Sequence, residues 1–500
     1  MISKRVRKGT ETFKSLQTNF EEKNRPLFLI LSIYESMPIT STPKRLKTPI
    51  LSPNFLQIVG GVVVFVVISS VGYGWMGYEL DRTQSKSLLL IYGVLFIGYG
   101  FVVTQKWSRR QTRWWMGVAV FFRLIFLFST PVLSDDFFRF IWDGRLLVGG
   151  FNPYLYLPSE VVNTPIFSTA NLSTTLYEGL NSPHYFTVYP PLNQLLFGVA
   201  AWTGGNNVQL SVIVMRFIIL MAEVGNCWLL SSPHNLGLRP AAKRKINSLA
   251  YALNPLVIVE LTGNLHFEAV TLFFVLLAIR WLNRPWPKDF YFTRSAVALG
   301  LGASVKLLPL IFLPLLVRRI GWQKGIIYCI VVGTVIIGLF LPFFSKSLVA
   351  NVGTSLDLYF QKFEFNASVY YLLREVGYWI TGYNLIQMLG PLLSLITLGT
   401  VSWLAFQKRS LVEKMLLSLT VYFFLATTVH PWYITTLVAL GAITRRWYPV
   451  VWSLLLPLTY VVYASSPYQE NLRVVGLEYV LVFGVFTYEI FLKGIDWKTN

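Results

Sequence analysis

Apolar runs of about 20 residues recur from residue 56 to residue 492, and each is long enough to cross a bilayer as a helix. A helix satisfies its own backbone hydrogen bonds in lipid, so the pattern predicts an all-α polytopic membrane protein with about 12–13 transmembrane helices. The predicted spans are 54–76, 87–105, 114–133, 208–231, 246–262, 267–283, 326–344, 384–406, 415–429, 431–444, 447–464 and 472–492.

Two apolar stretches depart from this pattern. Residues 295–317 carry basic residues at both ends, so we predict two short helices that meet near Lys306, where a nearby proline helps to break the helix. Residues 191–203 and 208–231 cannot both cross the membrane if Arg239 lies in the cytoplasm. We therefore expect residues 191–203, the shorter stretch, to form a partial or re-entrant helix.

Basic residues cluster between the apolar runs. The chain has 43 Lys and Arg residues against 23 Asp and Glu residues, and most of the 43 fall in such clusters or in the polar N-terminal segment. Clusters of this kind mark the cytoplasmic side of a membrane protein. We predict a basic, disordered cytoplasmic tail at residues 1–50 and an integral membrane domain at residues 51–500. The net charge of +20 is therefore a topology signal and not a nucleic-acid footprint.

The alternation of basic clusters places two long loops outside the cytoplasm, at residues 134–190 and 345–383. The first loop contains no Lys or Arg after Arg145. It opens with residues 134–145, whose helical periodicity puts acidic side chains on one face and leaves aromatic rings for the lipid. We therefore predict amphipathic surface helices in this loop.

Ionisable and polar side chains gather at the predicted outer face. They are Asp135, Asp136, Asp143, His266, Glu268, Lys306, Asn366 and His430. Ionisable groups near membrane depth are costly and usually functional. Structural alternatives stay open, because the adjacent aspartates suit a helix N-cap, and His266 and Glu268 can cap helix ends. Arg216 and Glu223 share one helical face and predict a structural pair inside the membrane.

This combination of groups suits one kind of chemistry. A carboxylate can take the proton of an acceptor hydroxyl as that hydroxyl attacks. Lys or Arg can hold a departing phosphate as charge develops on it. At a bilayer surface, the substrate that fits both is a lipid-linked phosphate. The chain has no Walker loop, no Rossmann glycine fingerprint and no HExxH motif, so nucleotide use and zinc hydrolysis lack support.

A series of motifs follows in order along the chain. The motifs are Ser134-Asp135-Asp136, Trp142-Asp143-Gly144-Arg145, Gly150-Phe151-Asn152-Pro153-Tyr154, Tyr189-Pro190-Pro191-Leu192, Asn264-Leu265-His266-Phe267-Glu268, Ser304-Val305-Lys306-Leu307-Leu308-Pro309, Phe365-Asn366 and His430-Pro431-Trp432-Tyr433. Over residues 115–445 this series resembles the GT-C glycosyltransferases that use polyprenyl-phosphate sugars, especially the dolichyl- or polyprenyl-phosphate-mannose mannosyltransferases.

The resemblance implies a GT-C-like fold and an inverting transfer of a sugar, with mannose favoured, from a polyprenyl-phosphate donor. In that family the first aspartate of the opening loop is taken as the catalytic base, and this position corresponds to Asp135 or Asp136 in the present chain. We favour Asp135 as the base and Asp136 in a supporting role. The residues expected to hold the donor phosphate are Lys306, Arg139 and His430. The residues expected to bind substrate are Asp143, Tyr154, His266, Glu268, Asn366 and Trp432.

The expected partners are a polyprenyl- or dolichyl-phosphate sugar donor, a glycan, lipid or protein acceptor, and membrane lipids, with no nucleic acid. No cofactor and no metal site are expected, and a role for a divalent metal stays open. We expect a multi-pass protein of a bacterial inner or plasma membrane, in preference to the endoplasmic reticulum, with an extracytoplasmic active site.

Two other classes of protein are alternatives. A transporter or flippase of lipid-linked sugars needs a polar path across the membrane, and the apolar runs contain few ionisable residues. Such a protein is also expected to have repeated halves, which this sequence does not show. A structural partner subunit would leave the aspartate pair unexplained. We therefore favour the glycosyltransferase.

Overall fold

The computed structural model describes residues 53–238, 246–284, 288–361, 363–465 and 467–492. Residues 1–61 and residues 62–500 are two separate units, and the features below belong to the second, apart from the N-terminal part of helix α3 (Pro53–Tyr78). The tail predicted at residues 1–50 lies outside the described residues. The described part of the chain is helical, and an isolated β-bridge joins Phe365 to Thr428.

The elements follow one another as helices (α) and short 3-10 or π turns (η). In chain order they are α3 (Pro53–Tyr78), α4 (Ser85–Thr104), α5 (Arg109–Ile125), α6 (Asp136–Val148), η1 (Pro153–Leu155), α7 (Pro158–Val161), α8 (Pro165–Thr169), α9 (Thr174–Glu178), α10 (Pro191–Gly204), α11 (Val208–Leu230), α12 (Ser248–Ala252), α13 (Pro255–Val257), η2 (Ile258–Gly263), α14 (Glu268–Leu282), α15 (Lys288–Val305), η3 (Leu308–Phe312), α16 (Leu313–Ile320), α17 (Trp322–Phe340), η4 (Leu341–Phe343), α18 (Leu348–Gln361), α19 (Val369–Thr381), α20 (Ile386–Phe406), α21 (Leu411–Leu425), η5 (Pro431–Ile434), α22 (Thr435–Thr444), α23 (Tyr448–Leu455), η6 (Leu456–Ala464), α24 (Leu472–Thr487) and η7 (Tyr488–Leu492).

Six helices in the described part are long and apolar enough to cross a membrane, and a bent pair of helices raises the number to as many as seven. They are Gly60–Tyr78, Ser85–Thr104, Val208–Leu230, Trp322–Phe343, Ile386–Phe406 and Leu472–Leu492, with the bent pair Pro255–Gly263 and Glu268–Leu282. The prediction of an all-α polytopic membrane protein is confirmed. The number is lower than the predicted value of about 12–13 because several apolar stretches form helices too short to cross alone. Examples are the 17-residue α5 and the 10-residue α22.

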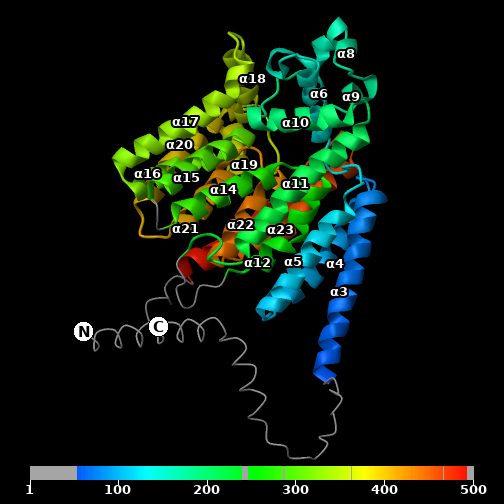
Figure 1. Ribbon diagram of the computed structural model, residues 1–500, viewed down its shortest axis with the longest axis vertical. Helices are drawn as coiled ribbons and strands as arrows, with labels where there is room; N and C mark the ends of the chain where they lie inside the picture. Colours follow the sequence, from blue (N-terminus) through cyan, green and yellow to red (C-terminus); the bar gives the residue numbers. More distant parts are fainter. Residues whose placement is uncertain (1–52, 239–245, 285–287, 362, 466, 493–500) are drawn as a thin grey trace, which may run out of the picture. The chain divides into compact units, whose positions relative to one another are not determined.

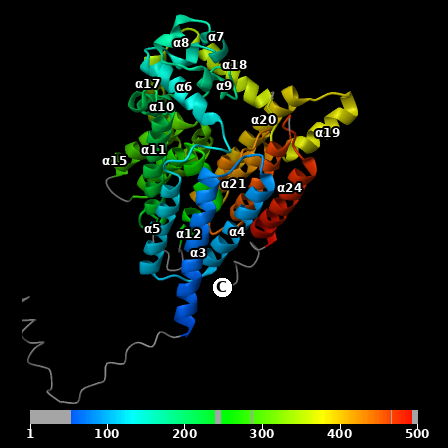
Figure 2. The same ribbon diagram turned by 90° about the vertical axis from the view of Figure 1, so that its right-hand side faces the viewer.

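The short helices of the first loop, α6 to α9, lie together at one end of the helical bundle, next to α10 and α18 (Figure 1, Figure 2). The rings of Phe140 in α6 and Phe197 in α10 stack with centroids 4.5 Å apart. A Cβ atom on Gly144 would lie 2.3 Å from the carbonyl oxygen of Phe197, so only glycine permits this approach. The contact positions the first turn of α6, which carries Asp136.

With 14 residues, α10 confirms the short helix predicted at 191–203.

Two helix breaks lie close to each other in space. As predicted, α15 ends just before Lys306, which lies in a non-helical turn ahead of η3. The helices on either side of residues 264–267 are bent by 113°, and Leu265 in this bend has a φ of +63°. A positive φ is an outlier for a bulky side chain, so the surrounding structure must impose the bend. An ion pair between Lys306 and Glu268 joins the two breaks.

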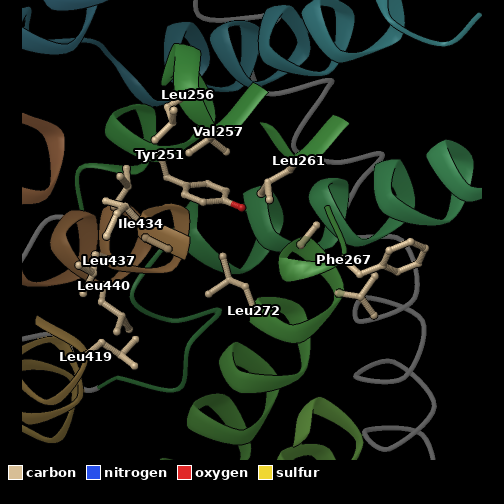
Figure 3. Close-up of a cluster of buried hydrophobic side chains, with 14 of the residues drawn as sticks. Tyr251, Leu256, Val257, Leu261, Phe267, Leu272, Leu419, Ile434, Leu437 and Leu440 are labelled. Carbon is tan, nitrogen blue, oxygen red and sulfur yellow. The ribbon is translucent and has the colours of Figure 1, made fainter. Parts of the chain in front are cut away.

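A cluster of buried apolar side chains holds the bend in place (Figure 3). Leu261 before the bend is 0% exposed, and Phe267 and Leu272 after it are each 1% exposed. They share this core with side chains of α12, α13, α21, η5 and α22, among them Tyr251, Leu256, Val257, Leu419, Ile434, Leu437 and Leu440. Truncating one side chain of such a core costs about 2–5 kcal/mol of stability. The bend is therefore a fixed feature of the fold.

The intramembrane pair predicted between Arg216 and Glu223 is wrong. Glu223 pairs with Arg123 of α5, over 2.8 Å, and both side chains are 0% exposed. Arg216 donates instead to backbone carbonyl oxygens of neighbouring segments. A shared helical face brings two side chains near one another, but the acceptors on adjacent elements decide which bonds form.

Candidate active site

Asp135 and Asp136 lie at the start of α6 and have different partners. Both carboxylate oxygens of Asp135 accept hydrogen bonds from Arg82, in the loop between α3 and α4, over 2.5 and 2.7 Å. The Cζ of Arg82 lies 5.2 Å from the centroid of the Tyr463 ring. A bidentate pair of this kind fixes a carboxylate in direction and occupies both of its oxygens. The side chain of Asp135 makes no capping hydrogen bond, so its role is to tie the first loop to Arg82.

Asp136 is half-buried and is held by neutral donors. The Asn181 amide donates to Oδ1 over 2.9 Å, and the Tyr189 hydroxyl donates to Oδ2 over 3.4 Å. Burial raises the pKa of Asp136 above its ordinary value, although Asn181 and the charge of Lys306 oppose the shift. A carboxylate with a raised pKa and no guanidinium attached is well suited to accept a proton.

Lys306 pairs with Glu268, the first residue of α14. The Lys306 side chain keeps 24% of its surface exposed, whereas the Glu268 side chain keeps 6%. The ammonium also lies 5.5 Å from the centroid of the Tyr433 ring. Oε2 of Glu268 is buried and has no hydrogen-bond partner in the described part of the chain. A partly exposed ammonium beside an unpartnered carboxylate oxygen is the arrangement expected where a polar ligand binds.

Four aromatic rings form a continuous stack beside Lys306. In order they are Phe365, His430, Trp432 and His266, with centroid separations of 5.0, 4.4 and 3.8 Å. Burial lowers the pKa of His430 to about 3, and the charge of Lys306 acts in the same direction. His430 is therefore a neutral ring at physiological pH. The stack is a rigid aromatic wall next to the ammonium.

Six predicted residues thus come together, and we call them the Lys306 cluster: Asp136, His266, Glu268, Lys306, His430 and Trp432. They come from α6, from the bend before α14 and the first residue of α14, from the break after α15, and from η5 with the residue before it. Both Asp136 and Glu268 stand at the first position of a helix, where the helix dipole favours a negative charge. Among the described residues, no group of three or more His, Cys, Asp or Glu is placed to hold a metal ion.

Arg139 and Asp143 are engaged with each other, with Nε 2.8 Å from Oδ1. Arg139 also donates to the carbonyl oxygens of Ser182 and Tyr185, and Asp143 accepts from Gln194 over 3.0 Å. Both side chains are buried. This ion pair holds the end of the first loop against α6 and α10.

Tyr154 and Asn366 are buried in packing sites of their own. Tyr154 is 1% exposed, and its hydroxyl donates to the carbonyl oxygen of Tyr189 over 2.7 Å. Asn366 is 0% exposed, and its amide donates to Glu478 over 3.2 Å. Within the described residues, no hydrogen bond or ion pair joins either side chain to the Lys306 cluster. Phe365, the residue before Asn366, stacks on His430 of the cluster.

Five residues that contact the predicted site residues are absent from the site predicted from the sequence. They are Arg82, Asn181, Tyr189, Glu260 and Tyr433. Arg82 carries a usable signal, because a basic residue in a loop predicted outside the cytoplasm departs from the positive-inside rule. Glu260 carries another, since it is a carboxylate inside an apolar run, and it lies 3.6 Å from the Nε2 of His266. Tyr189 and Tyr433 belong to two of the motifs quoted above, whereas Asn181 depends on how the first loop folds.

A family model matches residues 58–321, which include α6 and the Lys306–Glu268 pair. The model is that of the MptA_B family, described as "Alpha-(1->6)-mannopyranosyltransferase, N-terminal domain". Comparisons with curated proteins and with solved structures gave no match. The matched residues make up more than half of the chain, which therefore belongs to this family of GT-C-type mannosyltransferases.

Proposed function

We propose that the enzyme transfers mannose from a polyprenyl-phosphate mannose donor to a hydroxyl group of a glycan acceptor, with Asp136 as general base. The observation that supports this proposal best is the arrangement of the Lys306 cluster. A carboxylate held by neutral donors lies within electrostatic reach of a partly exposed ammonium. Sugar transfer needs both groups, because a base must meet the acceptor hydroxyl while a cation meets the leaving group.

In the proposed reaction, the acceptor oxygen attacks the anomeric carbon of the donor, and its proton passes to Asp136. The bond between the anomeric carbon and the phosphate oxygen breaks, and the phosphate keeps the electron pair. Lys306 stabilises the charge that develops on the phosphate. Attack opposite the leaving group inverts the anomeric centre, so an α-linked product requires a β-linked donor. The family description names an α-(1→6) linkage, which we propose for this chain as well.

The assignment of the base to Asp136 departs from the expectation that Asp135 is the base. Both oxygens of Asp135 accept hydrogen bonds from Arg82, so they are already occupied and poorly placed to take the proton of an acceptor hydroxyl. Asp136 has neutral donors and a raised pKa. We propose that Asp135 supports Asp136 by anchoring the first turn of α6 to Arg82.

The other residues of the site have supporting roles in this proposal. Lys306 holds the donor phosphate, while His430 is a neutral ring of the aromatic wall beside it and brings no positive charge. Trp432 and His266 line the sugar site, and the unpartnered oxygen of Glu268 accepts a sugar hydroxyl. The residues proposed to hold the loops in place are Arg139, Asp143, Tyr154 and Asn366.

The class of donor follows from the same geometry. The single ammonium of Lys306, beside neutral rings, can bind one phosphate group. A nucleoside diphosphate sugar needs a larger anion-binding site, such as a glycine-rich loop. We propose a lipid-linked phosphate because the site belongs to a membrane protein whose apolar helices give access to the lipid. A polyprenyl- or dolichyl-phosphate sugar meets both conditions.

A donor panel tests the proposed function. Purified enzyme is incubated with polyprenyl-phosphate β-mannose, polyprenyl-phosphate glucose or GDP-mannose, and with an α-mannoside that has a free 6-hydroxyl. We expect an α-(1→6)-linked product from the lipid-linked mannose and none from GDP-mannose. Equal or better transfer from GDP-mannose would show that the proposed donor class is wrong.

We also propose that the Lys306 cluster faces the extracytoplasmic side of a bacterial inner or plasma membrane, on the basis of the basic clusters in the sequence. A cysteine placed at the exposed Asn163 of the first loop, in a variant that lacks Cys227 and Cys329, tests the side. We expect an impermeant thiol reagent to label it from outside intact cells. Labelling only after the cells are opened would reverse the proposed orientation.

A further inference from the structure

Arg216 lies between two segments that lead to the Lys306 cluster. It belongs to α11, and its side chain is 0% exposed. The guanidinium donates to four backbone carbonyl oxygens, over 3.1, 2.6, 2.8 and 3.0 Å. The acceptors are, in that order, Leu127, Ser129, Thr262 and Gly263. In the described part of the chain, no carboxylate pairs with this arginine.

The four carbonyl groups belong to two segments that end helices. The first segment is the turn at residues 126–129, just after α5, which leads on to Asp136. The second is the end of η2 at Gly263, immediately before the bend that leads to Glu268. The carbonyl groups at the end of η2 have no partner within that helix, and those of Leu127 and Ser129 lie in the turn beyond α5, so each segment needs a donor from outside. One guanidinium supplies both segments.

Burying an arginine that has no carboxylate partner lowers the stability of a protein. Taking a guanidinium out of water costs several kcal/mol unless its donors are satisfied, and intramembrane charges are generally retained for function. Arg123 is equally buried, but it is neutralised by Glu223. Lysine cannot replace Arg216 in the same geometry, because an ammonium is a point charge while a guanidinium spreads five N–H donors over a rigid plane.

A further contact joins the same two segments nearer to the cluster. The N–H of Leu133 donates to Oδ1 of Asn264 over 3.3 Å. The hydroxyl of Tyr463, in η6, fixes the first segment from another side by donating to the carbonyl oxygen of Leu133 over 2.9 Å. The chain that enters α6 and the chain that enters α14 are therefore tied to each other at two places, by Arg216 and by the Leu133–Asn264 bond.

We propose that Arg216 is a positioning residue that sets the distance between Asp136 on one segment and the Lys306–Glu268 pair on the other. This inference rests on the proposed function, because it takes Asp136 and Lys306 as the groups whose spacing matters. Arg216 itself contacts neither sugar nor phosphate. A displacement of about 1 Å between reacting groups is enough to lower turnover by about a hundredfold.

The test compares Arg216→Lys with Arg123→Lys in the purified full-length enzyme, with polyprenyl-phosphate β-mannose and an α-mannoside acceptor. Both substitutions disturb a fully buried guanidinium, so both are expected to lower the melting temperature. We expect Arg216→Lys to lower kcat by about tenfold or more, at a donor KM within about twofold of the parent. Arg123→Lys should keep the parent kcat once the folded fraction is taken into account. Equal kcat values for the two variants would overturn the inference.

A double variant separates this inference from the proposed function. If Arg216 acts by positioning Asp136, Arg216→Lys should cost less in the Asp136→Asn background than in the parent, since residues that act as a unit are not additive. An equal loss in both backgrounds would overturn the inference and leave the proposed base intact. Retained turnover in Asp136→Asn alone would overturn the proposed base and, with it, the inference.

A milder variant covers the case in which Arg216→Lys does not fold. Asn264→Ala removes the acceptor of the Leu133 N–H and so loosens the same tie nearer to the cluster. We expect a fall of about threefold to tenfold in kcat at an unchanged donor KM. An unchanged kcat in this variant would overturn the inference.

Discussion

The Arg123–Glu223 ion pair and the charged groups of the Lys306 cluster both lie among the helices, but they differ in how completely their charged atoms are paired. Oε2 of Glu223 accepts from Arg123 over 2.8 Å. Its Oε1 accepts from Asn226 over 2.8 Å and from the Tyr251 hydroxyl over 2.5 Å. The ion pair is 0% exposed on both sides. These bonds join α5, α11 and α12, and they leave no charged atom of the pair for a ligand.

The Lys306 cluster is less complete. In the described part of the chain, Oε2 of Glu268 and Nε2 of His266 have no hydrogen-bond partner, although both atoms are buried. The Lys306 side chain is partly exposed. A buried polar atom without a partner costs free energy, so it persists where a ligand completes it. The two groups of charged residues thus differ in their roles. The fully paired Arg123–Glu223 group stabilises the fold, and the incompletely paired Lys306 cluster is where we propose that the reaction takes place.

The two adjacent aspartates show the same contrast within one turn of a helix. Arg82 binds both oxygens of Asp135, whereas Asp136 accepts hydrogen bonds from the amide of Asn181 and the hydroxyl of Tyr189. Residue type and sequence position do not distinguish them. Their partners do, because Arg82 occupies both oxygens of Asp135, whereas Asp136 has neutral donors and a pKa that burial raises.

The largest expected effect comes from Asp136→Asn, which removes the proposed base at nearly constant volume. We expect turnover to fall by about a hundredfold or more, since no carboxylate remains to accept the proton of the acceptor hydroxyl. Asp135→Asn is the matched control and should cost less, because it weakens an anchor and spares the base. Turnover is measured with polyprenyl-phosphate β-mannose on folded protein. A larger loss in Asp135→Asn than in Asp136→Asn would restore Asp135 as the base.

Lys306→Met is expected to have the next largest effect, because it removes the ammonium and keeps most of the apolar stem. We expect kcat/KM for the lipid-phosphate donor to fall by about tenfold to a hundredfold. The acceptor KM should change little. The exposed Lys346 provides a control, and Lys346→Met should leave transfer unchanged. Equal donor kinetics in the two variants would reduce Lys306 to a structural partner of Glu268.

The pH dependence of kcat/KM should show the raised pKa of Asp136. A general base works when it is deprotonated, so activity is present above its pKa and is lost as the pH falls through it. Burial raises this pKa, and the acid limb should therefore lie above the ordinary aspartate value of about 3.9. The limb should disappear from the residual activity of Asp136→Asn. A limb that survives unchanged in that variant would belong to another group.

Glu223→Gln should have the smallest effect on transfer, although it has a large effect on the fold. Breaking a buried ion pair by removing one charge costs about 3–5 kcal/mol. We expect a clear fall in the melting temperature in detergent, with kcat per folded molecule unchanged. A loss of kcat as large as that of Lys306→Met would contradict the division between the fully paired group and the incompletely paired one.

Much of the fold follows from local properties of the sequence. The apolar runs give the all-α polytopic class because the length of a run and the absence of charge are properties of each segment alone. The break at Lys306 was predicted in the same way, from a proline and from basic residues at both ends of a short stretch. The number of full spans was overestimated, because run length does not reveal where a helix bends or stops early.

The sequence by itself also determined which residue types gather near the site, since acidic, basic and aromatic groups at predicted outer loops stand out against an apolar chain. The tertiary structure alone decided their partners. Glu268 meets Lys306 across a bend and a break, Asp135 meets Arg82 from a distant loop, and Arg123 takes the carboxylate expected for Arg216. Ion pairs of this kind depend on distances of a few ångströms between elements far apart in the chain. Hydrophobic periodicity sets which face of a helix is buried, but it does not set which neighbour that face meets.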